Sequence, residues 1–196
     1  MSRRPSGRLV EVVETLVLTL IIFLVIQTFV AQPYQVKQDS MEHTVEPDQF
    51  VLVDKLTPRF APYARGDIVV FDPPVGAATA DRTPFIKRVI GVAGDTVQIG
   101  QDGLVYVNGT KLVEPYLFAT NGRAQPTTTS GQSVWHVPDG QLFVLGDHRQ
   151  VSTDSRVFGT VPVSSVVGRA WLRYWPLNVF GTLQNPGHPE LASPAP

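Results

Sequence analysis

Two side chains in this sequence have the chemistry of a nucleophile and its base. Ser40 lies in the segment Gln38-Asp39-Ser40-Met41-Glu42-His43-Thr44, shortly after a hydrophobic N-terminal stretch, and Lys87 lies in Phe85-Ile86-Lys87-Arg88-Val89-Ile90-Gly91. A serine hydroxyl becomes a useful nucleophile only when a base takes its proton. Lysine can be that base if its pKa falls far below about 10.4, as it does on burial among apolar groups. The pair predicts a hydrolase that works at a membrane surface.

Strand periodicity alone does not choose between Lys87 and its neighbour Arg88. In a strand, Lys87 shares a face with Phe85 and Val89, whereas Arg88 shares the other face with two isoleucines. Both faces are therefore apolar. Acid–base chemistry decides in favour of Lys87, because an arginine cannot be deprotonated in a protein. A lone lysine in a strand is most often a snorkelling surface residue, so the assignment needs further support.

The N-terminal stretch has the composition of a membrane anchor. Residues 1–8 contain three arginines and no acidic residue, and residues 9–31 are mostly Leu, Val, Ile, Phe and Thr. As a helix, residues 9–31 would extend roughly 34 Å, enough for a hydrocarbon core of about 30 Å. We expect a retained, single-pass transmembrane signal anchor, with residues 1–8 in the cytoplasm and residues from 32 onward outside.

Two other interpretations of this stretch are weaker. A cleaved signal peptide usually has a shorter apolar run, and this one also carries Glu11 and Glu14. A buried core helix would show a polar face, and none is evident.

The bulk composition limits the class of protein. The chain has 196 residues, of which 43% are hydrophobic, and its formal net charge is −1, which gives no electrostatic case for nucleic acid. It has no cysteine, which excludes disulfides and thiol catalysis, and its four histidines lack the spacing of metal ligands. Its 17 prolines and 16 glycines are spread along the chain, which favours many short strands over long helices.

Beyond the anchor, the sequence predicts a mainly β domain over residues 32–181. Expected strands cover residues 49–54, 67–71, 83–92, 96–99, 104–107, 141–145 and 165–175, with a hairpin turn between the fourth and fifth. Residues 98–140 are expected to form a smaller insert that contains a polar loop. Residues 182–196 are poor in apolar side chains and predicted to be a disordered tail. Trp171 and Trp175 are expected in the strand core, with a position at the membrane interface as the alternative.

Four segments, in order, make the chain resemble the bacterial type I signal peptidases, also called leader peptidases. The family's serine segment, Ser-Met-x-Pro-Thr, is similar to residues 40–44, and its Arg-Gly-Asp segment is similar to residues 65–71. Its lysine segment, Lys-Arg followed by hydrophobic residues and Gly-Asp, is similar to residues 87–95. Its last segment, Gly-Asp-Asn-Arg-x-x-Ser-x-Asp-Ser-Arg-x-x-Gly, is similar to residues 146–159 and is close to unique. The resemblance extends over about residues 9–176.

The resemblance implies a role for five residues. Ser40 would attack the scissile carbonyl of a secretory preprotein, Lys87 would act as general base and then general acid, and the Ser40 backbone N–H would bind the oxyanion. Ser152 would hydrogen-bond the Lys87 amine, and Asp154 and Arg156 would form a supporting ion pair.

The resemblance also implies a setting and a fold. It implies cleavage after small residues, typically Ala-x-Ala, with no metal or cofactor. The partners would be preproteins and the lipid bilayer of the bacterial cytoplasmic membrane, with no nucleic acid. The oligomeric state stays open, with a monomer favoured. The implied fold consists of coiled antiparallel sheets with a smaller inserted β subdomain.

The chain departs from the family at three positions near the expected site. His43 replaces the usual proline, His148 replaces the usual asparagine, and Gln38 stands where many members have serine or glycine. Loss of the proline is expected to loosen the loop that carries Ser40. A serine–histidine pair with His43 is a weaker alternative, as is a self-cleaving repressor with the same dyad. The main alternative is a catalytically impaired homologue that binds preproteins or a partner without cleaving them.

Overall fold

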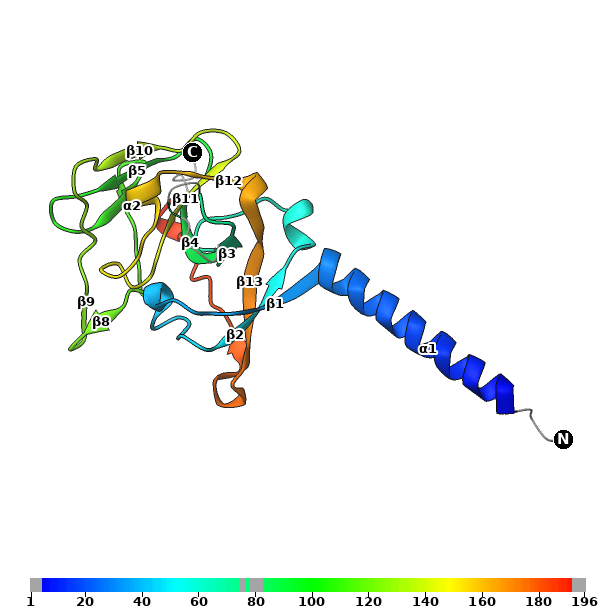
Figure 1. Cartoon of the computed structure of the whole chain (residues 1–196). Helices are drawn as coiled ribbons and strands as arrows, with labels where there is room; N and C mark the ends of the chain where they lie inside the picture. The colour runs from blue at the N-terminus through cyan, green and yellow to red at the C-terminus, as the bar shows by residue number, and fades with distance from the viewer. Residues whose placement is uncertain (1–4, 75–76, 78–82, 192–196) are drawn as a thin grey trace.

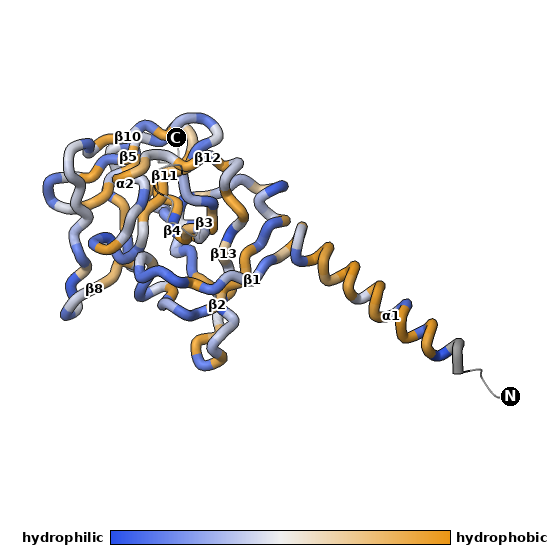
Figure 2. Tube along the Cα trace, viewed as in Figure 1, coloured by the Kyte–Doolittle hydropathy of each residue, from blue (hydrophilic) through white to orange (hydrophobic). Residues whose placement is uncertain are grey.

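A long N-terminal helix projects from a β domain (Figure 1). The computed structural model describes residues 5–74, 77 and 83–191. Helix α1 (Pro5–Val25) continues into the π-helical turn η1 (Ile26–Val30) and ends there, because Pro33 favours extended backbone at the residue before it. Within the described residues, Arg8–Val30 is the one helical stretch long and apolar enough to cross a membrane, and none of its most apolar window is buried in the protein. Figure 2 shows that most residues along this helix are hydrophobic.

Eight strands of the described chain form one large antiparallel sheet. The order is β1-β2-β13-β3-β4-β11-β12, and β14 pairs with β13. Register shifts in β13 and between Phe143 and Val144 of β11 bend the sheet, as extra residues in a ladder do. The strands are β1 (Ala31–Gln35), β2 (Phe50–Asp54), β3 (Ile68–Phe71), β4 (Phe85–Gly91), β11 (Gln141–Leu145), β12 (Val161–Pro162), β13 (Val166–Trp175) and β14 (Gly181–Thr182).

Strand β4 is central, and every residue in it is buried. Phe85 and Val89, which alternate with Lys87, belong to a core cluster that includes Val69, the residue opposite Lys87 in the register. Ile86 and Ile90 face the other way, into two further clusters. Both faces of β4 are therefore apolar, as the alternation predicts, and Lys87 and Arg88 enter the protein interior in opposite directions.

A smaller β subdomain is inserted between β4 and β11, at the end of the molecule far from α1 (Figure 1). Its sheet has the order β10-β5-β6-β7, and its strands pack around a core that includes Val97, Val107 and Trp135. The strands are β5 (Thr96–Ile99), β6 (Val105–Val107), β7 (Thr110–Lys111) and β10 (Val134–His136), with a separate hairpin of β8 (Ala119–Thr120) and β9 (Arg123–Ala124). The predicted mainly β fold with an inserted subdomain is confirmed.

Short helices occupy several connections around the sheets. They are η2 (Asp39–Met41), η3 (Thr57–Arg59), η4 (Val163–Ser165), η5 (Leu177–Val179) and η6 (Pro189–Leu191), all 3₁₀, and the α-helical turn α2 (Ser155–Phe158).

The C-terminal segment differs from the predicted disordered tail. Thr182 pairs within the sheet, Asn185 donates to the Asp67 carboxylate at 3.0 Å, and Glu190 accepts the Val113 N–H at 2.8 Å. Leu191 packs against the core of the inserted subdomain. Residues 182–191 are thus held mainly by specific polar contacts, which a low apolar content does not reveal. Residues 1–4 and 192–196, at the outer ends of the predicted cytoplasmic segment and tail, lie outside the described residues.

Candidate active site

Ser40 lies on a tight turn whose flanks are anchored in the core. It is the middle residue of η2, which follows β1, and its exposed fraction is 3%. Met41 and Val45 are fully buried in the cluster formed by β2, β3 and β13, so the chain is fixed on the C-terminal side of Ser40. Val36 is buried in the same cluster on the N-terminal side. Apolar anchoring on both sides fixes the position of a short polar turn.

The structure brings Lys87 into direct contact with Ser40. Lys87 Nζ lies 2.7 Å from Ser40 Oγ and 3.0 Å from the carbonyl oxygen of Ile86. Only 1% of Lys87 is exposed, and its Nζ lies 5.1 Å from the centre of the Phe85 ring. Within the described part of the chain, no carboxylate forms an ion pair with this amine.

Burial makes this amine an available base. Removal from water disfavours the ammonium form and lowers the pKa of Lys87 to about 8. Asp154 and Asp147 act at longer range in the opposite direction and raise this pKa, and Arg156 lowers it further. At pH 7 roughly one Lys87 in ten then carries the neutral amine, against fewer than one in a thousand for an unperturbed lysine.

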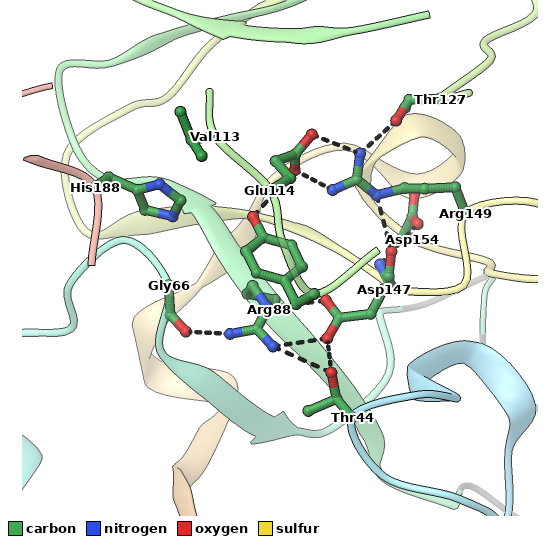
Figure 3. A network of polar contacts seen from close by, with 12 residues as sticks. Thr44, Gly66, Arg88, Val113, Glu114, Thr127, Asp147, Arg149, Asp154 and His188 are labelled. Carbon is green, nitrogen blue, oxygen red and sulfur yellow. Dashed lines mark hydrogen bonds and ion pairs between the residues drawn. The ribbon is translucent and has the colours of Figure 1, made fainter. Parts of the chain in front are cut away.

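Arg88, on the opposite face of β4, is a buried cation whose charge is balanced by the carboxylate of Asp147. Its guanidinium donates to both carboxylate oxygens of Asp147 at 2.9 and 2.7 Å and to the Gly66 carbonyl at 2.9 Å. Figure 3 shows the guanidinium between Gly66, Thr44 and Asp147. Adjacent residues of one strand therefore differ in chemistry. Arg88 is paired with Asp147 and permanently charged, whereas Lys87 has no carboxylate partner among the described residues and can lose its proton.

The segment 146–149 lies directly against the turn that carries Ser40. A Cβ atom on Gly146 would approach the Ser40 carbonyl oxygen to 2.5 Å and would also collide with Ser152 Oγ, so only glycine fits. The next residue, Asp147, accepts the Thr44 hydroxyl at 2.5 Å. Arg149 is buried and paired with Glu114 of the inserted subdomain (Figure 3). This segment connects the strand that carries Lys87, the turn that carries Ser40 and the insert.

The other predicted site residues lie close by but make different contacts. Ser152 Oγ is buried and, among the described residues, has no hydrogen-bond partner, so the expected bond to the Lys87 amine is not formed. Lys87 Nζ instead bonds Ser40 and the Ile86 carbonyl. Asp154 and Arg156 do form an ion pair, with two contacts of 2.8 Å.

The Asp154–Arg156 pair acts on the backbone around the site. Asp154 caps α2 by accepting the Arg156 N–H and also accepts the Gly146 N–H at 3.1 Å. Arg156 donates to the Arg149 carbonyl at 2.7 Å. The pair therefore holds the segment 146–156 in its course past Ser40.

His43, which replaces the family's proline, has a backbone that proline cannot adopt. Its φ is +81°, and its N–H donates to Glu46 Oε1 at 3.0 Å. Proline requires φ near −65° and has no N–H. The expected loosening of the loop is therefore not what the geometry indicates, because the turn is built on a different conformation with its own hydrogen bond.

Restoring the family residue should consequently harm this protein. We expect His43→Pro to lower the free energy of unfolding by about 2–3 kcal/mol, because it reverses φ and removes a hydrogen bond. His43→Gly, the matched control, tolerates positive φ and should stay within about 1 kcal/mol of wild type. Chemical denaturation of the three proteins measures the difference. A His43→Pro protein as stable as wild type would contradict the described backbone.

Two hollows open beside the Ser40 turn. One, of about 360 Å³, is lined by Gln38, Ser40 and Phe85 together with Val151 and Thr153. The other has room for little more than a methyl group, about 20 Å³, and its walls are largely apolar, with Val36, Val51, Val70, Pro84 and Ile86. Both are also lined by Lys37 and Gln38, so they lie along the same stretch of chain.

Several contacts in this region could not be predicted from the sequence. Thr44, Glu114 and Phe118 contact the segment 146–149, but none lies in a pattern that assigns it a partner. His148 stood out as a departure from the family, yet its partner, Glu42, is more than a hundred residues away in sequence. Composition and periodicity carry no signal for such long-range polar pairs.

A mainly β domain with a buried serine in contact with a buried lysine is the architecture of a serine peptidase. The family model described as signal peptidase, peptidase S26, matches residues 9–175, and the chain belongs to this family. It is 38% identical to the signal peptidase I of Leptolyngbya laminosa, over 93% of this chain and 88% of the relative. It is 32% identical to the signal peptidase I of Mycobacterium tuberculosis (93% and 78%) and to signal peptidase IB of Staphylococcus aureus (91% and 95%).

Proposed function

We propose that this chain is a membrane-bound endopeptidase that removes N-terminal signal peptides from secretory preproteins, with Ser40 as nucleophile and Lys87 as base. The observation that carries the proposal is the 2.7 Å contact between Lys87 Nζ and Ser40 Oγ in a buried site. This distance is within the range for direct proton transfer between a base and a hydroxyl. Membership of the signal peptidase family supports signal peptides as the substrate class.

The chemistry follows from this contact. Neutral Lys87 takes the Ser40 proton while Oγ attacks the scissile carbonyl carbon, and the tetrahedral oxyanion accepts a hydrogen bond from the Ser40 N–H. That N–H is in the first turn of η2, where backbone donors have no acceptor inside the helix. The Lys87 ammonium then protonates the leaving amine, and the C–N bond breaks to leave an ester on Ser40. Lys87 next deprotonates a water that hydrolyses the ester and returns the proton to Oγ.

The small size of one of the two hollows supports cleavage after a sequence with small side chains such as Ala-x-Ala. In an extended substrate, alternate side chains point to the same face, so the last residue before the cleaved bond and the residue two positions earlier face the enzyme together. The hollow at Ser40 and the small apolar hollow share Lys37 and Gln38, so they are neighbours on the enzyme surface. The limited volume of the second hollow favours a methyl side chain over a larger one.

A single membrane span formed by α1 and η1 would keep the site beside the bilayer. The three arginines before residue 9 favour an N-terminus in the cytoplasm and a peptidase domain outside. Trp171 and Trp175 are exposed rather than in the strand core, and beyond β13 Leu177 and Phe180 are 70% and 61% exposed. Such an apolar loop fits the headgroup region of a bilayer, which supports membrane lipid as the second partner.

Cleavage of a model preprotein tests the proposal. The full chain in detergent micelles should release a mature protein from a preprotein with Ala-x-Ala before the cleavage site, and Ser40→Ala should release none. Ser40→Ala removes only the hydroxyl oxygen and should keep the fold, so it is the matched inactive control. Equal behaviour of wild type and Ser40→Ala would refute the proposal. Binding of the preprotein without cleavage by either protein would favour the impaired homologue instead.

A further inference from the structure

His148 contacts the nucleophile turn at two separate points. Its backbone N–H donates to the Ser40 carbonyl at 3.0 Å, and its ring Nδ1 lies 2.5 Å from Glu42 Oε2. Glu42 is the second residue after Ser40, so both contacts lie at or directly after Ser40 in the chain. Among the described residues of segment 146–149, His148 alone bonds both Ser40 and a second residue of its turn.

Hydrogen bonds hold the backbone on the N-terminal side of His148 in place. The Gly146 N–H donates to Asp154, the Gly146 carbonyl accepts from Arg149 Nε at 3.0 Å, and the Phe118 N–H donates to the Asp147 carbonyl at 3.1 Å. The imidazole stacks on the Phe118 ring, with centres 3.9 Å apart and planes 16° from parallel. A side chain held on one face by an aromatic ring and at its edge by a carboxylate has little freedom to move.

The chemistry of the pair defines the direction of the hydrogen bond. An ionised carboxylate only accepts hydrogen bonds. His148 Nδ1 therefore carries a hydrogen and donates it in a hydrogen bond to Glu42 Oε2. His148 is therefore not placed as a base for Ser40: it meets Ser40 through its backbone, and its ring edge is occupied by Glu42. We propose that His148 and Glu42 are positioning residues that hold the Ser40 turn in register with Lys87. This inference rests on the proposed function of Ser40 and Lys87.

The local backbone explains why the His148–Glu42 hydrogen bond is needed. Between Glu42 and Thr44 the chain passes through His43, which is exposed and in the left-handed region. On the far side, Thr44 is tied to Asp147 at 2.5 Å. The His148–Glu42 bond is the corresponding tie next to Ser40. Without it, the turn can shift relative to Lys87, and a displacement of about 1 Å at a reacting atom reduces a rate by about 100-fold.

Substitutions that move the donor by one bond provide a sharp test. In His148→Asn the side-chain nitrogen is as many bonds from Cα as Nδ1 is, so the bond to Glu42 can persist. In His148→Gln the nitrogen is one bond farther out, and in His148→Ala it is absent. We expect kcat on a preprotein to fall about tenfold or more for the Gln and Ala variants, with KM within about twofold. The Asn variant should keep kcat within about threefold of wild type.

Glu42→Ala should reproduce the effect, and the Glu42→Ala/His148→Ala double variant should be no worse than either single variant, because both remove the same bond. His136→Ala is the matched control: His136 is an exposed residue of the inserted sheet whose ring contacts Thr96. It should leave kcat unchanged. Melting temperatures of all variants separate a positional effect from loss of fold.

The outcomes are distinguishable. A wild-type kcat in His148→Ala would overturn the positioning role, as would an equal loss in His148→Asn or a loss confined to temperatures near the melting point. Additive losses in the double variant would show that the two residues act separately and would also overturn it. If wild type itself is no more active than Ser40→Ala, the proposed function fails rather than this inference.

Discussion

Lys87→Arg should abolish cleavage of a preprotein, with kcat reduced by at least about 1000-fold. The change keeps the positive charge next to Ser40 but removes the base, because a guanidinium does not lose its proton near neutral pH. The site makes this a severe change, since Lys87 Nζ is the group in contact with Ser40 Oγ and is shielded from water. Single-turnover cleavage of a preprotein by purified full-length variants measures the loss.

Two further variants separate loss of the base from loss of the fold. Lys111→Arg, on an exposed strand of the insert, makes the same change away from the site and should retain full activity. Lys87→Met is neutral, fits an apolar setting and should also be inactive, yet its free energy of unfolding below pH 8 should exceed that of wild type by about 1–3 kcal/mol, because no amine is then desolvated. Measurable turnover by Lys87→Arg would remove Lys87 from the role of base.

The second large effect is on pH dependence. Burial lowers the pKa of Lys87 from 10.5 to about 8, so the active neutral amine is lost as pH falls through 8. We expect kcat/KM to rise about tenfold per pH unit between pH 6 and 7.5 and to level off above pH 8.5, a total change of about 100-fold. Initial rates at substrate concentrations far below KM give this profile. A profile that is flat from pH 6 to 8 would exclude a lysine of this pKa as the base.

The lowered pKa of Lys87 also predicts how the free energy of unfolding depends on pH, in the range above pH 8. Between about pH 8 and 10.5 the unfolded Lys87 is still protonated while the folded one is neutral, so the unfolded state binds more protons. The contribution of Lys87 to the free energy of unfolding therefore increases with pH across this window and is constant below it. Comparing urea denaturation of wild type and Lys87→Met at pH 7 and pH 10 isolates this contribution.

Much of the architecture was predictable because it depends on local patterns. The apolar run of residues 9–31 defines a helix of membrane length, and the strands at residues 50–54, 68–71, 85–91 and 141–145 follow from short apolar runs bounded by turn residues. The C-terminal segment was predicted less well. Glu190 and Asn185 hold it through bonds to residues far away in sequence, and composition is blind to such bonds.

At the site, the sequence by itself determined which residue types are available for chemistry. It identified Ser40, and it chose Lys87 over Arg88 because only one of the two can release a proton. Only the tertiary structure decided how they meet. Lys87 is buried with no carboxylate partner in the described part of the chain, Arg88 is neutralised by Asp147, and Ser152 does not bond the amine. The reason is physical. Proton affinity of a side chain type is a local property, whereas its pKa and its partners depend on burial and on residues brought close by folding.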